Sequence, residues 1–162
     1  MDAPPLHDAL RPLAFLLGTW RGSGAGNYPG IDDFEYGEES RFWHYGRPVL
    51  AYAQRTWSAA SGAPMHSEMG FWRLAGDGLE VVLSHAFGIT EILTGEVEGE
   101  RLTLHSRSLT SAPTAKHVEA VGRTIQVTGD ELTYDVQMAF GEHELQPHLR
   151  AALKRVDDPT LP

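Results

Sequence analysis

Residues 18–31 read GTWRGSGAGNYPGI and contain the pattern Gly-x-Trp-x-Gly-x-Gly at Gly18, Trp20, Gly22 and Gly24. The hydrophobic pattern changes at this point, from helical spacing before Gly18 to alternation of period two after it. Glycine inside a strand permits a sharp bend. We therefore expect a first strand that bends where a barrel closes, with Trp20 filling the floor of that barrel.

The segment before this motif, residues 6–18, is LHDALRPLAFLLG. Asp8 is favourable at the start of a helix, and Gly18 is a natural stop. Pro12 stands in the middle, where proline removes a backbone hydrogen-bond donor and interrupts an α-helix. We expect a short, interrupted N-terminal helix that covers one end of the domain with the side chains of Leu6, Leu10, Leu13, Leu16 and Leu17.

The chain after the motif alternates between apolar and polar residues and is punctuated by turns such as Gly76-Asp77-Gly78 and Gly129-Asp130. The segment 145–156, LQPHLRAALKRV, is open between a helix, which its leucine spacing suits, and a final strand, which a closing sheet needs. Turns about a dozen residues apart without intervening helices favour an antiparallel meander. The other candidate strands are 19–26, 35–46, 48–59, 63–75, 78–87, 88–99, 100–109, 116–129 and 130–140.

The predicted fold class is therefore all-β, an antiparallel barrel of about ten strands with a short N-terminal helix. A barrel of that size leaves no long sheet edge and encloses a cavity rather than a solid core. We expect a single domain over residues 1–156 and a disordered tail over 157–162.

Composition excludes several classes of site and partner. The chain has 162 residues and no cysteine, so disulfides, thiolate zinc sites, iron–sulfur clusters and cysteine nucleophiles are ruled out. The net charge of −9 disfavours nucleic acid and anionic membranes as partners. No apolar run approaches the length of a membrane span, and the N-terminus has no charged region typical of a signal peptide. We expect a cytoplasmic protein.

Three histidines stand out as candidate functional residues. His85 shares an apolar strand face with Leu83 and Phe87, whereas His66 lies opposite a methionine face, so its direction stays open. His148 follows Pro147 in apolar surroundings, where a polar group needs a partner. It is either a core histidine bonded to a backbone carbonyl or a metal or haem ligand. We expect solvent exposure for His7, His105, His117 and His143.

The Gly-x-Trp motif alone occurs in several small-ligand barrels, including lipocalins and fatty-acid-binding proteins. Together with other segments, however, the chain closely resembles the nitrobindins, which are haem-binding β-barrels also described as peroxynitrite isomerases. The resemblance runs from about Leu6 to Arg155. Its segments are 18–29, FEYGEESRFWHYGRPVLAYAQRTW (34–57), PMHSEMGFWRL (64–74), EVVLSHAFGITEILTGEV (80–97), APTAKHVEAVGRTI (112–125), ELTYDVQM (131–138) and LQPHLRAALKR (145–155).

The resemblance implies a function and a cofactor. His148 matches the family's axial ligand to haem iron, with one haem b per chain held in the ferric state. The open iron face would bind nitric oxide reversibly and isomerise peroxynitrite to nitrate. His66 and His85 match pocket positions near the haem, and Gly30 stands where relatives often carry a threonine. Lys116 is a candidate propionate partner at the mouth, with Arg123 as a weaker candidate.

Other functions share parts of this pattern. A metal-free carrier of lipophilic molecules would have the same motif and cavity. A zinc site built from His143, Glu144 and His148 is a second alternative, although their spacing fits no standard motif. A third is an interaction protein that kept the barrel and lost the pocket. Apolar outward strand positions also leave a homodimer open.

Overall fold

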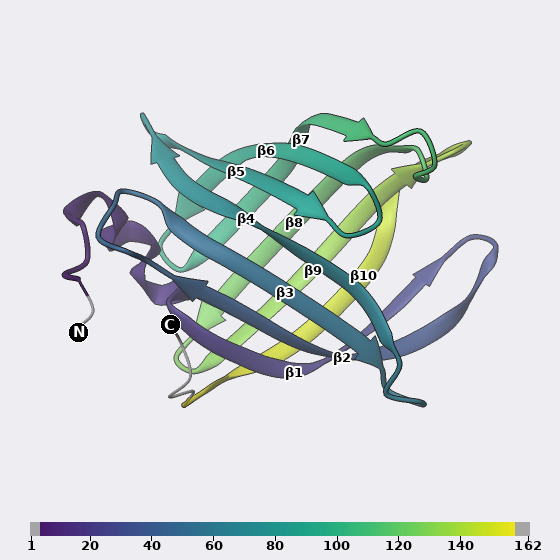
Figure 1. Cartoon of the computed structure of the whole chain (residues 1–162), viewed down its shortest axis with the longest axis horizontal. Helices are drawn as coiled ribbons and strands as arrows, with labels where there is room; N and C mark the ends of the chain where they lie inside the picture. Colours follow the sequence, from purple (N-terminus) through teal and green to yellow (C-terminus); the bar gives the residue numbers. More distant parts are fainter. Residues whose placement is uncertain (1–3, 158–162) are drawn as a thin grey trace.

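The computed structural model describes residues 4–157 and forms a closed antiparallel barrel of ten strands behind a short N-terminal helix, as predicted (Figure 1). Consecutive strands are neighbours throughout, and β1 pairs with β10 to close the sheet. The elements are η1 (Asp8–Leu16), β1 (Gly18–Tyr28), β2 (Ile31–Trp43), β3 (Leu50–Ser58), β4 (Pro64–Ala75), β5 (Gly78–His85), β6 (Ile89–Glu98), β7 (Arg101–Ser111), β8 (Val118–Thr128), β9 (Glu131–Phe140) and β10 (His143–Val156).

The segment that the sequence left open is the closing strand β10. It pairs with β9 on one side and with β1 on the other, from Thr19 opposite Val156 to Gly26 opposite Leu149. A helix here would leave both neighbouring strands with unpaired edges. The predicted tail, 157–162, lies outside the described residues except for Asp157.

The N-terminal segment forms one 3₁₀ helix, so the expected interruption at Pro12 is wrong. Side chains in a 3₁₀ helix repeat every three residues, and Leu10, Leu13 and Leu16 are all fully buried. The helix lies across one end of the barrel (Figure 1). No helix within residues 4–157 is long and apolar enough to cross a membrane.

Trp20 fills the barrel floor beside η1, as the motif predicted. It is fully buried, and its indole Nε1 donates to the Leu16 carbonyl at 2.8 Å. The guanidinium of Arg155 lies 4.1 Å from the centre of its ring. Gly22 of the motif allows the backbones of β1 and β10 to approach closely, because a Cβ at this position would collide with the Ala152 carbonyl of the closing strand.

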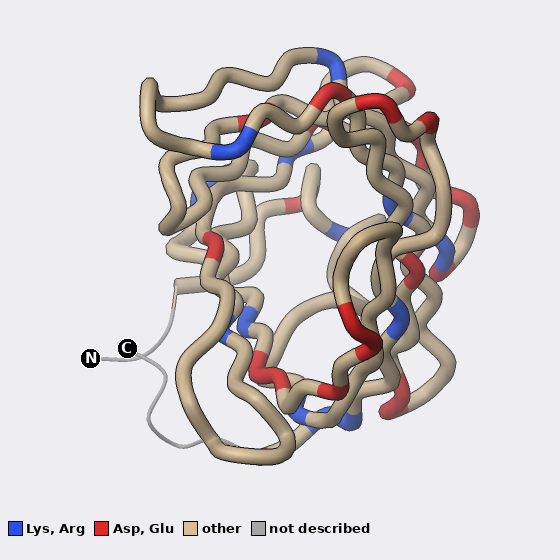
Figure 2. Tube along the Cα trace, turned by 90° about the vertical axis from the view of Figure 1, so that its right-hand side faces the viewer, with Lys and Arg blue, Asp and Glu red and all other residues tan. Residues whose placement is uncertain are grey.

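Alternation sorts the strands into an inner and an outer face. Leu79, Val81 and Leu83 of β5 point inward and are almost completely buried. On β4 the inward face is the one that carries His66, Glu68 and Trp72, because Met69 and Phe71 on the other face are 62% and 50% exposed. The structure thus settles the direction of His66. Acidic and basic residues are interspersed around the wall (Figure 2).

The outer face carries an ion-pair ladder centred on Glu39 of β2. Arg21 of β1 and Arg55 of β3 flank it across the strands, with N–O distances of 2.5 and 3.2 Å. Burial raises the pKa of Glu39, but the hydrogen bonds from Arg21 and Arg55 outweigh burial and leave that pKa lower than its ordinary value.

We expect Glu39→Gln to destabilise the protein at neutral pH by up to about 1 kcal/mol, because the arginines are partly exposed. A carboxylate with a lowered folded-state pKa stabilises the protein above its ordinary pKa of 4.5, and this stability is lost as the pH falls through the folded-state value. Urea unfolding at neutral and acidic pH measures the difference between variant and parent. A difference that stays constant across this range would show that the charge contributes nothing.

Candidate functional site

The barrel encloses a cavity of about 620 Å³. Its lining includes residues of the loop between β7 and β8, which lies at the end of the barrel away from η1 (Figure 1). Its wall brings together four of the residues singled out from the sequence, His66, His85, Lys116 and His148. Gly30 is not among the lining residues. It lies in the turn between β1 and β2 with a φ of 86°, which favours glycine and gives a conformational reason for its presence.

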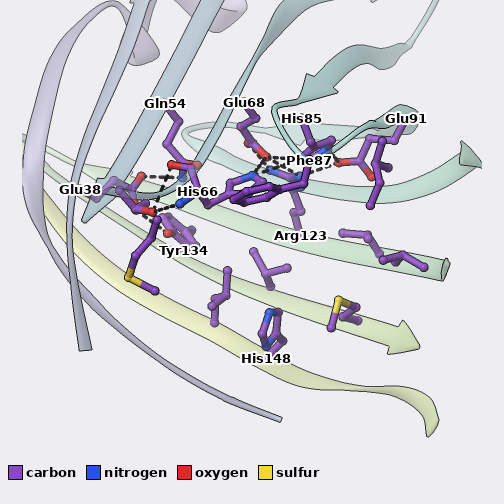
Figure 3. Close-up of a pocket in the computed structure, with 18 of the residues that line it drawn as sticks. Glu38, Gln54, His66, Glu68, His85, Phe87, Glu91, Arg123, Tyr134 and His148 are labelled. Atoms are coloured by element: carbon purple, nitrogen blue, oxygen red, sulfur yellow. Dashed lines mark hydrogen bonds and ion pairs between the residues drawn. The ribbon is translucent and has the colours of Figure 1, made fainter. Parts of the chain in front are cut away.

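His148 is presented to the cavity by a β-bulge. Pro147 is opposite Gln137 of β9 and Leu149 is opposite Val136, so His148 is an extra residue on β10. Pro147 has no backbone N–H to donate, which weakens the ladder where the bulge forms. The bulge turns the His148 ring toward the lumen (Figure 3).

The hydrogen bonds of His148 determine which of its ring nitrogens is free. Nδ1 lies 3.0 Å from the backbone carbonyl of Asn27, which can only accept, so Nδ1 carries the proton. Burial lowers the pKa of His148, while the hydrogen bond that its ring donates to the Asn27 carbonyl acts in the opposite direction. Nε2 of the neutral ring therefore holds a lone pair and has no hydrogen-bond partner within residues 4–157. The hydrogen bond to a backbone carbonyl is confirmed, and the role of His148 as a metal or haem ligand stays a prediction.

Across the cavity from His148, four strands contribute a cluster of charged side chains (Figure 3). Arg123 of β8 donates to both carboxylate oxygens of Glu68 on β4, at 2.7 and 3.2 Å, and to Glu91 on β6 at 2.5 Å. Its side chain is nearly buried. The candidate role of Arg123 as a propionate partner is therefore wrong, because both carboxylates hold it inside the barrel.

His85 of β5 lies between the two carboxylates of this cluster. Nδ1 is 3.1 Å from Glu68 and Nε2 is 3.0 Å from Glu91. Burial lowers the pKa of His85, but the two carboxylates outweigh it and raise the pKa to about 9. Burial also raises the pKa of Glu68, and the charge of Arg123 more than reverses this, so that this pKa falls well below its ordinary value.

His66 completes the cluster on the side of the cavity. Nε2 lies 3.3 Å from Glu68 and 3.1 Å from Nδ1 of His85. Its ring packs against the exposed ring of Phe87, with ring centres 5.9 Å apart.

The sequence identified His66 and His85 but missed Glu68, Glu91 and the true role of Arg123. The sequence does contain one indication of the buried carboxylates: Glu91 alternates with the apolar residues Ile89 and Leu93, which puts a charged residue on the inward face of its strand.

A second polar network lies deeper, around the buried Glu38 of β2. This carboxyl group accepts from Tyr134 at 2.5 Å, from Ser40 at 2.7 Å and from Gln54 at 3.0 Å (Figure 3). Burial raises the pKa of Glu38 despite these hydrogen bonds. Tyr134 also shares a hydrogen bond of 2.7 Å with Tyr36. The sequence analysis did not identify this network.

Lys116 lies in the loop between β7 and β8 and is exposed at the rim of the cavity. A zinc site at His143, Glu144 and His148 is not supported, because the described residues gather metal-type ligands only at His66, Glu68 and His85. His7, His105, His117 and His143 are exposed, as predicted.

Comparisons with known proteins agree with this geometry. The family described as "THAP4-like, heme-binding beta-barrel domain" matches residues 9–155. A peroxynitrite isomerase of Arabidopsis thaliana is 42% identical over 156 residues, which are 96% of this chain and 93% of that protein. Peroxynitrite isomerase 2 of Mycobacterium avium is 49% identical and covers 93% of this chain and 96% of its own length.

The crystal structure of Rv2717c from M. tuberculosis superposes with a TM-score of 0.88 at 45% sequence identity. The match covers 94% of this chain and 100% of that one. The agreement in fold and sequence extends over nearly the whole barrel, from the helix that closes it to the strand that carries His148. This chain therefore belongs to the THAP4-like haem-binding β-barrel domain family.

Proposed function

We propose that this protein binds one haem b per chain through His148 and, in the ferric state, isomerises peroxynitrite to nitrate. Reversible binding of nitric oxide at the same iron face is part of the proposal. Family membership supports the haem, and the names of the relatives support the reaction. The axial ligand is inferred from the geometry of the cavity, whereas the ferric state follows from the resemblance to the nitrobindins.

The observation that carries the proposal is the free Nε2 of His148. A neutral imidazole with its other nitrogen fixed by a carbonyl is a good haem-iron ligand. The cavity fits the group, because apolar side chains, including Ile89, Leu109 and Met138, line the same cavity as the imidazole. His148 would therefore hold the iron, and Lys116, which lines the cavity and is exposed, would pair with a propionate.

Haem held by a single imidazole supplies an open coordination position that acts as a Lewis acid on a bound oxygen. The side chains of the protein would orient the haem and enclose the bound ligand in the cavity. His148 is fixed in angle by Asn27, and the ring of Tyr28 packs against its edge with centres 5.3 Å apart. His66 and Phe87 line the side of the cavity with the charged cluster. Isomerisation consumes no electron and no second substrate, so no reductase site is required.

A metal-free lipophilic carrier is the alternative function, and the lining of the inner cavity disfavours it. The ionised Glu68, Glu91 and Arg123 border the space that an alkyl chain would fill. An alkyl chain offers these groups no hydrogen bonds, so its entry would desolvate charge without compensation. The family match favours haem.

Stopped-flow mixing of haem-loaded protein with peroxynitrite tests the activity. We expect decay to accelerate in proportion to the loaded protein, with nitrate as the product and the ferric spectrum unchanged afterwards. The haem-free chain should leave the decay at its uncatalysed rate. Loaded protein that binds nitric oxide but leaves peroxynitrite decay unchanged would reject the isomerase and keep only the haem site.

Lys116→Gln is expected to weaken haem binding several-fold, because one exposed ion pair contributes no more than about 1 kcal/mol. The loss should shrink at high salt, since salt screens exposed charges. Haemin titration at low and high ionic strength measures both effects. Lys154→Gln on the exposed side of β10 is the matched control and should bind haem like the parent. Equal affinities in both variants would remove Lys116 from the haem site.

We also propose that two copies pair through the outer face of β4–β6. Phe71, Val82 and Ile92 lie opposite one another on these strands, and all three are at least 42% exposed. Met69 extends this uncharged row on β4. A contiguous apolar patch on an outer sheet face is typical of an interface. Light scattering on the purified protein measures the oligomeric state.

A further inference from the structure

The inner cluster contains three ligand-type atoms arranged as a nearly equilateral triangle (Figure 3). Nδ1 of His85 is 3.1 Å from both Nε2 of His66 and Oε2 of Glu68, and the latter two are 3.3 Å apart. A tetrahedral metal ion with bonds of about 2.0–2.1 Å holds its ligands about 3.3–3.4 Å apart, and an octahedral one holds them slightly closer. The triangle therefore has the size of one face of a metal coordination shell.

The outer partners of the three side chains are those that orient metal ligands. His85 directs Nε2 at the Glu91 carboxylate at 3.0 Å, which fixes its ring and leaves Nδ1 facing the triangle. The other oxygen of Glu68, Oε1, accepts from Arg123 at 2.7 Å and from Tyr52 at 3.0 Å. Metal-binding histidines and carboxylates usually carry such carboxylate and hydrogen-bond partners.

We propose that His66, Glu68 and His85 bind one divalent transition-metal ion of the Zn²⁺ type inside the barrel. Two imidazoles and one carboxylate are a common donor set for catalytic zinc, in which a fourth position stays open. All three residues line the cavity, so the open position faces the space between this cluster and His148. Its three ligands do not include His148, the proposed haem ligand, so the metal site does not depend on the proposed haem function.

Charge also indicates what would occupy the fourth position. With neutral histidines, the charges of Glu68, Glu91 and Arg123 sum to minus one, and a divalent ion brings the cluster to plus one. An anion such as hydroxide on the open position restores neutrality in a buried site. The rival arrangement has no metal and keeps a proton on both nitrogens of His85, which neutralises the cluster equally. Metal binding must therefore displace the Nδ1 proton of His85.

Elemental analysis of the purified full chain, followed by titration of chelator-treated, haem-free protein with Zn²⁺ and Co²⁺, tests the site. We expect one ion per chain and visible Co²⁺ absorption bands of a tetrahedral site. His66→Gln and His85→Gln should each weaken binding at least about 100-fold, and Glu91→Gln about 10–100-fold. His105→Gln, which removes an exposed histidine, should bind like the parent.

Two results would overturn the proposal. One is a parent chain that binds neither ion, and the other is a parent whose binding persists in both His66→Gln and His85→Gln, as expected for surface histidines. Thermal unfolding checks that the variants fold, and Zn²⁺ should raise the midpoint of the parent and of His105→Gln but not that of His66→Gln or His85→Gln. Haemin titration of the same variants is read separately, so loss of the metal with retained haem, or the reverse, assigns each failure to its own site.

Discussion

His148→Ala is expected to abolish tight haem binding while leaving the barrel folded. The imidazole is the donor that the cavity presents with a free lone pair, Nε2, on a ring fixed by the Asn27 carbonyl. Loss of even an outer partner of a metal ligand costs about 10–100-fold in affinity, so loss of the ligand should cost at least about 100-fold. Haemin titration should show a sharp one-to-one Soret shift in the parent and a weak, broad one in the variant.

The matched control for this experiment is His143→Ala. His143 lies on the same strand and packs against the same ring, Tyr28, but it is exposed. It should bind haem like the parent, which separates the ligand from general effects of removing a histidine from β10. An unchanged Soret band in His148→Ala would reject His148 as the ligand and move attention to the opposite wall, where His66 lies.

Arg123→Met is expected to destabilise the fold by about 3–5 kcal/mol, because it removes the guanidinium that two buried carboxylates share. Glu68 and Glu91 are almost completely buried, and Arg123 hydrogen-bonds to both. Methionine keeps much of the apolar stem, so the loss reports charge and hydrogen bonds more than packing. Urea unfolding of the haem-free, chelator-treated chain at neutral pH measures this change in free energy.

Arg150→Met is the control for the arginine variant. Arg150 pairs with Asp135 at 3.0 Å on the outer surface, where both side chains are mostly exposed. Its removal should change the free energy of unfolding by less than about 1 kcal/mol. Similar effects in the two variants would mean that water compensates the interior carboxylates as well as it does those outside. The free-energy cost of leaving Glu68 and Glu91 without Arg123 would then be far smaller than their burial implies.

The parts of the fold that were predictable from the sequence are those set by short-range patterns. Alternation places Leu79, Val81 and Leu83 on one face, because successive side chains of a strand point to opposite sides. The Gly-x-Trp motif predicted the position of Trp20. The proline interruption was wrong for η1, because the segment adopts a 3₁₀ helix that includes Pro12.

The candidate site was predictable only in part. Four of the predicted residues line one cavity, whereas Gly30 lies in a turn outside it. Alternation could not assign a direction to His66, because both faces of β4 carry apolar residues. Arg123 appeared to be a surface cation because nothing local to β8 shows the carboxylates that pair with it.

The sequence by itself thus determined the all-β class and the start of the barrel, since alternation and glycine act within a few residues of themselves. Only the tertiary structure decided that the last segment is a strand, because its pairing with β1 and β9 depends on closure of the sheet. The same closure brings Arg123 to Glu68, 55 residues away in the sequence. Buried charges are tolerated only where they form ion pairs with opposite charges, and closure of the barrel brings these partners together.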